Sequence, residues 1–208
     1  MRTAECRPYS AKETEIGMNI ILGSKSPRRS ELLTKLGVAF EVLAADVDES
    51  TAPELSAGEA VAQISARKAA VTARLAGPDD LIVCADTVVV LDDRVMGKPK
   101  TPAEAREMLT ALSGRTHEVL TGLTVRRGEQ AVTVVECTRV TFRALLPREI
   151  ETYIASGEPM DKAGSYGIQG LAASFVSHLD GDYFNVMGLP LCALTGILRR
   201  FGVRVLGA

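Results

Sequence analysis

The chain has 208 residues, a length typical of one domain, and 46% of them are hydrophobic, which is enough to bury a core without disulfides. Its formal net charge is -2 with basic and acidic side chains interspersed, which argues against a long nucleic acid as partner. No apolar run approaches the ~20 residues of a membrane-spanning helix, so no membrane association is expected.

Residues 1–17 are polar and charged, and they lack the apolar stretch of a secretory signal. A strand-like run follows Met18 directly, which predicts that residues 1–17 are a loose extension or reflect an upstream start codon; an ordered N-terminal element is the alternative. The four cysteines lie far apart in the sequence, which favours reduced thiols. We therefore expect a cytoplasmic protein with a single domain at residues 18–208.

Short β-like runs alternate with helical patterns in the first half of the chain, an order that favours an α/β fold over a helix bundle or a sandwich. Helix starts and ends are indicated by prolines at first helical positions, by a capping-box sequence at Thr101 and by glycines after the last turns. The expected strands are 20–22, 40–44, 81–85 and 88–91, and the expected helices are 27–36, 58–75 and 102–113.

The second half begins with a β-rich pattern. Two long strands between residues 118 and 142 are expected to form a hairpin that turns at Gly128 and Glu129. After a short helix at 147–155, the glycine-rich segment 157–170 predicts a loop shaped for close approach of the backbone. The chain is then expected to form a last hairpin, turning at Asp180 and Gly181, and a closing helix at 190–201.

Two arginines lie in the first turn of the predicted helix 27–36, where the free N–H groups and the macrodipole are already positive. A bound anion would relieve this mismatch. The helix N-terminus, Arg28, Arg29 and the hydroxyls of Ser24 and Ser26 would together bind a phosphate group. Two solvated arginines are the alternative.

Two charged residues lie where apolar residues are expected. Lys68 falls on the apolar face of the predicted helix 58–75, so its ammonium must either snorkel to solvent or point into a polar cleft. Asp86 interrupts the apolar stretch and is expected at the end of a buried strand, where its carboxylate requires a metal, a lysine or several N–H donors. The alternative is an aspartate that serves only a turn or a cap.

Acidic residues after the second strand add oxygen ligands. Asp46, Asp48 and Glu49 are of the type that Mg²⁺ prefers when it is shared with substrate phosphates, although acidic loops are often only solvated. With Asp86, the arginines and Lys98, they complete a set of groups that phosphate-ester hydrolysis uses.

Three other chemistries are disfavoured. The only histidines, His117 and His178, have no metal-ligand spacing, so a metal site built on histidine is not expected. The chain also lacks the nucleophile elbow of serine hydrolases and the phosphate-binding loop of P-loop enzymes.

Five segments, in order along the chain, resemble the Maf family of nucleotide pyrophosphatases. They are residues 22–29 (LGSKSPRR), 84–87 (CADT), 97–99 (GKP), 113–117 (SGRTH) and 158–170 (EPMDKAGSYGIQG). The resemblance implies an elongated mixed β-sheet flanked by helices, with two lobes and a central cleft, like inosine triphosphate pyrophosphatases. It also implies a homodimer and hydrolysis of nucleoside triphosphates to the monophosphate and pyrophosphate, with Mg²⁺, Mn²⁺ or Co²⁺ as the divalent metal.

The resemblance also implies roles for single residues. Asp86 would accept the proton of the attacking water and, with Glu49, hold the metal. Lys68 and Lys98 would act on the phosphates as further catalytic residues. The residues expected to bind substrate are Ser24, Arg28, Arg29, Thr87, Lys162 and Gln169.

Residues 161–170 further resemble the branch of the family that acts on dTTP and UTP. Arg28, Thr87 and Gln169 align with positions linked to that preference, and the amide of Gln169 has both the donors and the acceptor that suit a uracil or thymine edge. Two alternatives remain open. One is a nucleotide-binding regulator of cell division or septum formation, and the other is a 7-methyl-GTP or purine pyrophosphatase.

Overall fold

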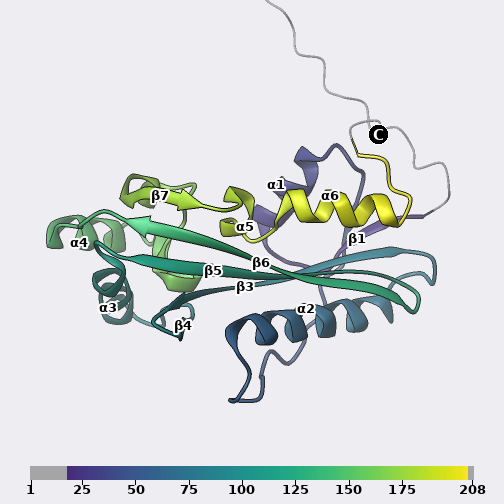
Figure 1. The fold of residues 1–208 in the computed structure, drawn as a ribbon, viewed down its shortest axis with the longest axis horizontal. Coiled ribbons are helices and arrows are strands. Elements are labelled where there is room, and N and C mark those ends of the chain that lie inside the picture. Colours follow the sequence, from purple (N-terminus) through teal and green to yellow (C-terminus); the bar gives the residue numbers. More distant parts are fainter. Residues whose placement is uncertain (1–17, 206–208) are drawn as a thin grey trace, which may run out of the picture.

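The computed structural model describes residues 18–205. The predicted loose extension at residues 1–17 lies outside this range. The molecule is elongated, with long strands that run along its length and helices on both sides of them (Figure 1). Within residues 18–205, no helix combines the length and the apolar character needed to cross a bilayer. Cys84, Cys137 and Cys192 are free thiols, of which Cys84 is buried and the other two are exposed.

Seven strands form one mixed sheet in the order β2-β1-β3-β5-β6-β7, with β4 paired to β3. The two neighbours of β1 run parallel to it, and the other pairs are antiparallel. The strands are β1 (Ile20–Leu22), β2 (Glu41–Val42), β3 (Leu81–Leu91), β4 (Arg94–Met96), β5 (Thr116–Arg127), β6 (Gln130–Phe142) and β7 (Val176–Asp180). The predicted α/β fold with a mixed sheet is therefore confirmed.

Helices cover both faces of this sheet. The helices are α1 (Pro27–Lys35), α2 (Ala57–Ala73), α3 (Pro102–Leu112), α4 (Pro147–Ala155), α5 (Tyr183–Val186) and α6 (Leu191–Arg200), and 3₁₀ turns occur at Glu158–Asp161, Ala163–Ser165 and Leu171–Phe175. In Figure 1, α2 lies on one side of the long strands and α6 on the other, while α3 and α4 lie at the end of the molecule away from β1.

The apolar run of β3 supplies both faces of the sheet. Leu81 and Val83 point into the main hydrophobic core, whereas Ile82 and Cys84 pack with Ala69 of α2 in a second, smaller cluster. Successive residues of a strand point to opposite faces, so a strand covered on both sides needs an apolar run without alternation.

Helix α2 lies directly on the sheet where β5 has a glycine. A Cβ placed at Gly122 would come within 2.2 Å of the carbonyl oxygen of Val61, so only glycine allows this approach. Gly122 pairs with Asp86 of β3. The close approach therefore lets a side chain of α2 reach the middle of β3.

The helix starts follow the local sequence closely. In α2, Ser56 and Glu59 form a reciprocal capping box, which we did not anticipate from the sequence. In α3, Thr101 accepts a hydrogen bond from the backbone N–H of Glu104, as predicted, but the Glu104 carboxylate accepts from the N–H of Lys100. The predicted helix 147–155 is confirmed at both ends.

Three expectations were wrong. Asp86 lies in the middle of β3, not at a strand end, because β5 pairs with β3 continuously from Ile82 to Val90. The last hairpin does not form: β7 pairs with β6, and Asp182 then caps the short helix α5 by accepting from the N–H of Phe184. The second strand is shorter than residues 40–44, since β1 pairs only with Glu41 and Val42.

Candidate active site

A cleft of about 900 Å³ lies between α1, α2, β3 and the segment 157–170. A smaller hollow of about 460 Å³ adjoins it at the N-terminus of α1. Each of the site residues predicted from the sequence lines at least one of the two: Ser24, Arg28, Arg29, Glu49, Lys68, Asp86, Thr87, Lys98, Lys162 and Gln169. Their roles stay predictions, but their convergence from six segments of the chain is a property of the fold.

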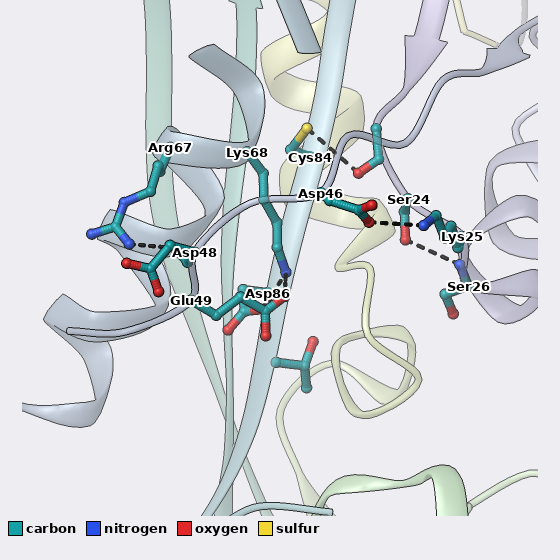
Figure 2. A network of polar contacts seen from close by, with 12 residues as sticks. Ser24, Lys25, Ser26, Asp46, Asp48, Glu49, Arg67, Lys68, Cys84 and Asp86 are labelled. Carbon is teal, nitrogen blue, oxygen red and sulfur yellow. Dashed lines mark hydrogen bonds and ion pairs between the residues drawn. The ribbon is translucent and has the colours of Figure 1, made fainter. Parts of the chain in front are cut away.

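Lys68 joins two carboxylates at the wall of the cleft (Figure 2). Its ammonium nitrogen lies 2.7 Å from Oδ1 of Asp86 and 2.7 Å from Oε1 of Glu49. The side chains of Lys68 and Asp86 are 15% and 13% exposed, whereas that of Glu49 is 61% exposed. Lys68 thus points into a polar cleft, and it is the lysine that the buried strand position of Asp86 requires.

Of the three acidic residues after β2, only Glu49 reaches this pair. The carboxylate of Asp46 pairs with Lys25 at 2.9 Å on the surface. The carboxylate of Asp48 accepts hydrogen bonds from the N–H and the hydroxyl of Ser50, at 2.9 and 2.7 Å. The sequence placed all three among the candidate oxygen ligands, and the structure reduces them to one, because local turn bonds and a surface ion pair occupy the other two.

Arg67 of α2 holds the backbone on both sides of Glu49. Its Nη1 donates to the carbonyl oxygen of Asp48 and, at 2.9 Å, to that of Ser50. Figure 2 shows Arg67 and Lys68, neighbours in α2, directed at this same acidic segment. The position of Glu49, which lies in no helix or strand, therefore depends on an arginine that does not itself line the cleft.

The N-terminus of α1 has the open geometry expected of an anion site. Ser26 is the N-cap residue, but its side chain makes no capping hydrogen bond, and its backbone N–H donates to Oγ of Ser24 at 3.2 Å. Arg28 is about one-third exposed and pairs at 3.6 Å with Asp161, which lies in the 3₁₀ turn after α4. Free N–H groups and a positive dipole remain at this end of the helix.

Arg29 is already bonded to the protein. It donates from Nε to the carbonyl of Gly188 at 2.7 Å, from Nη1 to Ser24 at 3.2 Å and from Nη2 to Thr87 at 3.1 Å. Burial lowers its pKa, although the guanidinium stays charged. Three of its N–H groups thus join α1, β3 and the loop after α5, and only the remaining ones are available to a phosphate.

The hydroxyl of Thr87 is also hydrogen-bonded within the protein. The hydroxyl of Thr121 donates to the carbonyl of Asn185 at 3.2 Å, so in the 2.9 Å contact between Thr87 and Thr121 the hydroxyl of Thr87 is the donor. Thr87 also accepts from Arg29. It can therefore offer a substrate a lone pair but not its proton.

The remaining predicted residues come from the connection between β4 and α3 and from the segment 157–170. Lys98 is exposed and borders both hollows. The ammonium of Lys162 donates to the carbonyl of Glu158 at 2.7 Å and to Asp161 at 2.6 Å, so it is partly used by its own loop. Gln169 is exposed and lines the large cleft.

Glu49 and Asp86 have the chemistry of a magnesium-type site. Two carboxylates that contact one ammonium nitrogen lie close together, and Mg²⁺ is usually held by one or two carboxylates together with substrate phosphates. Among residues 18–205, no group of three or more His, Cys, Asp or Glu side chains forms a complete metal cage. The two carboxylates match the donor number that Mg²⁺ takes from a protein, and the metal itself stays a prediction.

Several residues of this site were missed from the sequence. Arg67 acts on backbone carbonyls, which no sequence pattern reveals. Tyr153 and Glu158 hold the segment 157–170 through a phenol and a carboxylate, and they were assigned only to a helix and to a motif. The buried hydroxyl of Thr121 gave no signal, because threonine is ordinary in a strand.

The family model described as "Maf-like protein" matches residues 19–201. A dTTP/UTP pyrophosphatase of Bacillus cereus (strain ATCC 10987 / NRS 248) is 46% identical over 93% of this chain and 95% of its own length. Another, from Bacillus cereus (strain ZK / E33L), is 46% identical over 89% of this chain and 97% of its own length.

Among solved structures, the Staphylococcus aureus Ham1 protein aligns with a TM-score of 0.52 at 10% sequence identity, covering 88% of this chain and 99% of that protein. This likeness concerns the fold alone. The family model covers nearly the whole described chain, including every segment that carries the site. The chain belongs to the Maf family.

Proposed function

We propose that this protein is a divalent-metal-dependent pyrophosphatase that cleaves pyrimidine nucleoside triphosphates, above all dTTP and UTP, to the monophosphate and pyrophosphate. The observation that carries the proposal is the contact of Lys68 with both Glu49 and Asp86 beside a cleft of nucleotide size. The relatives named dTTP/UTP pyrophosphatases support the choice of substrate.

The triphosphate would bind across the two hollows. The smaller one offers the N–H groups of α1, and Arg28 and Lys98 border both, so their charges would face the β- and γ-phosphates. Lys68 would take up charge that develops on the α-phosphate in the transition state. A divalent metal held by Glu49 and Asp86 would supply Lewis-acid polarisation of the phosphate oxygens.

Asp86 is the best-placed general base. Its Oδ1 is held by Lys68, and no described residue donates a hydrogen bond to Oδ2. That oxygen is thus free to accept a proton from a water that attacks the α-phosphorus, while the ion pair fixes the orientation of the carboxylate. The leaving group is pyrophosphate, whose charge the basic residues of the smaller hollow would stabilise.

The test is the variant Asp86→Asn, which keeps the shape of the side chain and removes the base. We expect kcat for dTTP to fall by at least about 100-fold, while dTMP binding changes little. The matched control is Asp79→Asn, on the surface beside Arg127, which is expected to leave kcat unchanged. Pyrophosphate release by Asp86→Asn at the rate of the unaltered protein would remove Asp86 from the mechanism.

A nucleotide panel separates this proposal from its alternatives. Pyrophosphate release is measured with dTTP, UTP, CTP, GTP, 7-methyl-GTP and a 5-modified UTP, each with Mg²⁺, Mn²⁺, Co²⁺ or EDTA. Binding of dTTP without turnover would favour a nucleotide-binding regulator of cell division, and a preference for 7-methyl-GTP would favour the other branch. The homodimer and the cytoplasmic location stay predictions, and light scattering tests the first of them.

A further inference from the structure

The turn that carries Gln169 lies in neither a helix nor a strand, yet it forms part of the cleft wall. Within the turn, the N–H of Gly170 donates to the carbonyl of Gly167 at 3.1 Å. Ile168 is buried in the main core, but Gln169 and Gly170 are exposed, and a single local bond does not fix their backbone against thermal motion. The position of Gln169 therefore depends on what the rest of the segment contacts.

Two side chains fasten this turn at both of its ends. Tyr153 of α4 is 2% exposed, and its hydroxyl accepts from the N–H of Gly167 at 3.1 Å and donates to Oε1 of Glu158 at 3.0 Å. The other oxygen of Glu158 accepts from the N–H of Leu171 at 3.1 Å. One phenol and one carboxylate thus hold the backbone immediately before and after the residues that present Gln169.

The turn packs directly onto these groups. A Cβ at Gly170 would lie 2.1 Å from Oε1 of Glu158, and a Cβ at Gly167 would lie 2.7 Å from Cε of Lys162. A side chain at either position would therefore displace the carboxylate of Glu158 or the end of the Lys162 side chain. Lys162 in turn donates to the carbonyl of Glu158 at 2.7 Å, which holds the start of the segment.

The ring of Tyr153 has a separate and ordinary task. It packs against Phe175 edge to face, with ring centroids 5.2 Å apart, as a core aromatic does. That contact needs no hydroxyl. The hydroxyl is what the turn uses, so the two tasks can be separated by removing one oxygen atom.

We propose that the Tyr153 hydroxyl and the Glu158 carboxylate are positioning residues that hold Gln169 toward the nucleobase and thereby set the preference for pyrimidine nucleotides. The inference rests on the proposed function, because it takes the base as the partner of Gln169. A preorganised amide keeps its hydrogen bonds to the correct base without an ordering cost, whereas a mobile amide adapts to several bases.

The first experiment compares Tyr153→Phe with Tyr183→Phe, the same change at a tyrosine that is 40% exposed. In Tyr153→Phe, kcat/KM for UTP is expected to fall about tenfold through KM, with kcat retained, and the ratio of kcat/KM for UTP over GTP is expected to fall with it. Tyr183→Phe should match the unaltered protein. A role limited to packing would lower the values for both nucleotides together and leave the ratio unchanged, which would overturn the proposal.

A second experiment follows the turn without any substrate. Glu158→Gln keeps the size of the side chain but replaces one acceptor oxygen with an NH₂ group. The glutamine side chain then has one acceptor oxygen, so its two ends cannot accept from both Tyr153 and Leu171. Hydrogen exchange at the amides of Gly167 and Leu171 is expected to become at least about tenfold faster in this variant and in Tyr153→Phe. Unchanged exchange in both variants would overturn the positioning role.

The two experiments also separate this inference from the proposed function. If the unaltered protein showed no preference for pyrimidines, the proposed function and the link to base selection would both fail. Faster exchange in the variants would then still establish that Tyr153 and Glu158 position the turn. If the unaltered protein prefers UTP and both variants keep the full ratio, the proposed function stands and the inference fails.

Discussion

Lys68 is the residue on which the charge balance of the cleft depends, since one ammonium group contacts both Asp86 and Glu49. In Lys68→Met the two carboxylates would face each other without a cation. We expect Mn²⁺ to bind this variant about tenfold more tightly, corresponding to ~1.4 kcal/mol, because the ammonium no longer competes for the same oxygens. Turnover of dTTP is expected to fall at least about 100-fold, because the charge on the α-phosphate loses its partner.

The two readouts of Lys68→Met move in opposite directions, which a misfolded variant cannot reproduce. Calorimetric titration with Mn²⁺ measures the first, and pyrophosphate release measures the second. Lys35→Met, an exposed position at the end of α1, serves as control for the loss of one positive charge. Weaker Mn²⁺ binding in Lys68→Met would show that Glu49 and Asp86 do not hold the cation together.

The acidic segment after β2 shows how an element without regular structure is held. Arg67 donates to the carbonyls of Asp48 and Ser50, on either side of Glu49. Arg67→Met is expected to weaken Mn²⁺ binding by about 10-fold, as the loss of an outer contact to a ligand-bearing segment typically does. The melting temperature should change little, because these contacts are at the surface.

Arg74→Met, at the exposed C-cap position of the same helix, is the matched control for Arg67→Met. Calorimetry with Mn²⁺ in the presence of dTMP measures the effect on the segment directly. An unchanged affinity in Arg67→Met would mean that Glu49 takes its position without the arginine. The contacts of Arg67 with the acidic segment would then have no effect on metal binding.

Elements whose signals are local were predictable from the sequence. The start of α3 at Thr101 and Pro102 and the hairpin of β5 and β6 are determined by neighbouring residues, and both were expected at these positions. Asp86 was misplaced because a charged residue in an apolar run looks like a strand end. Its partner Lys68 is 18 positions away on α2, and no local rule connects the two.

At the scale of the whole molecule, the cleft arises from segments that are distant in the sequence. Arg28, Lys68 and Gln169 come from α1, α2 and a turn of the segment 157–170, and only the sheet order and the approach of α2 at Gly122 bring them together. The types of residue in the site were predictable, because several charged side chains lie at positions where the sequence pattern favours an apolar residue or the opposite charge. Their distances were not, because these depend on packing contacts such as the one between Gly122 and Val61.

His117 links the stability of the whole fold to pH. It is 2% exposed, its Nε2 lies 2.8 Å from the hydroxyl of Tyr166, and its ring packs against Phe142. Burial lowers the pKa of His117 from 6.5 to about 4. Between these two pH values His117 thus stays neutral in the folded protein, whereas it is protonated in the unfolded chain.

The sign of this effect is set by the depressed pKa in the folded state. The contribution of a neutral His117 to stability is fully present above pH 6.5 and is lost as pH falls toward 4, amounting to about 3 kcal/mol over that range. In His117→Gln, which cannot take up a proton, the free energy of unfolding should depend less steeply on pH between 6.5 and 4. The exposed His178→Gln is the control and should keep the steep dependence of the unaltered protein, as measured by urea unfolding at several pH values. Equal slopes in His117→Gln and the unaltered protein would place the acid sensitivity in the carboxylates instead, because no other buried histidine exists among residues 18–205 to carry it.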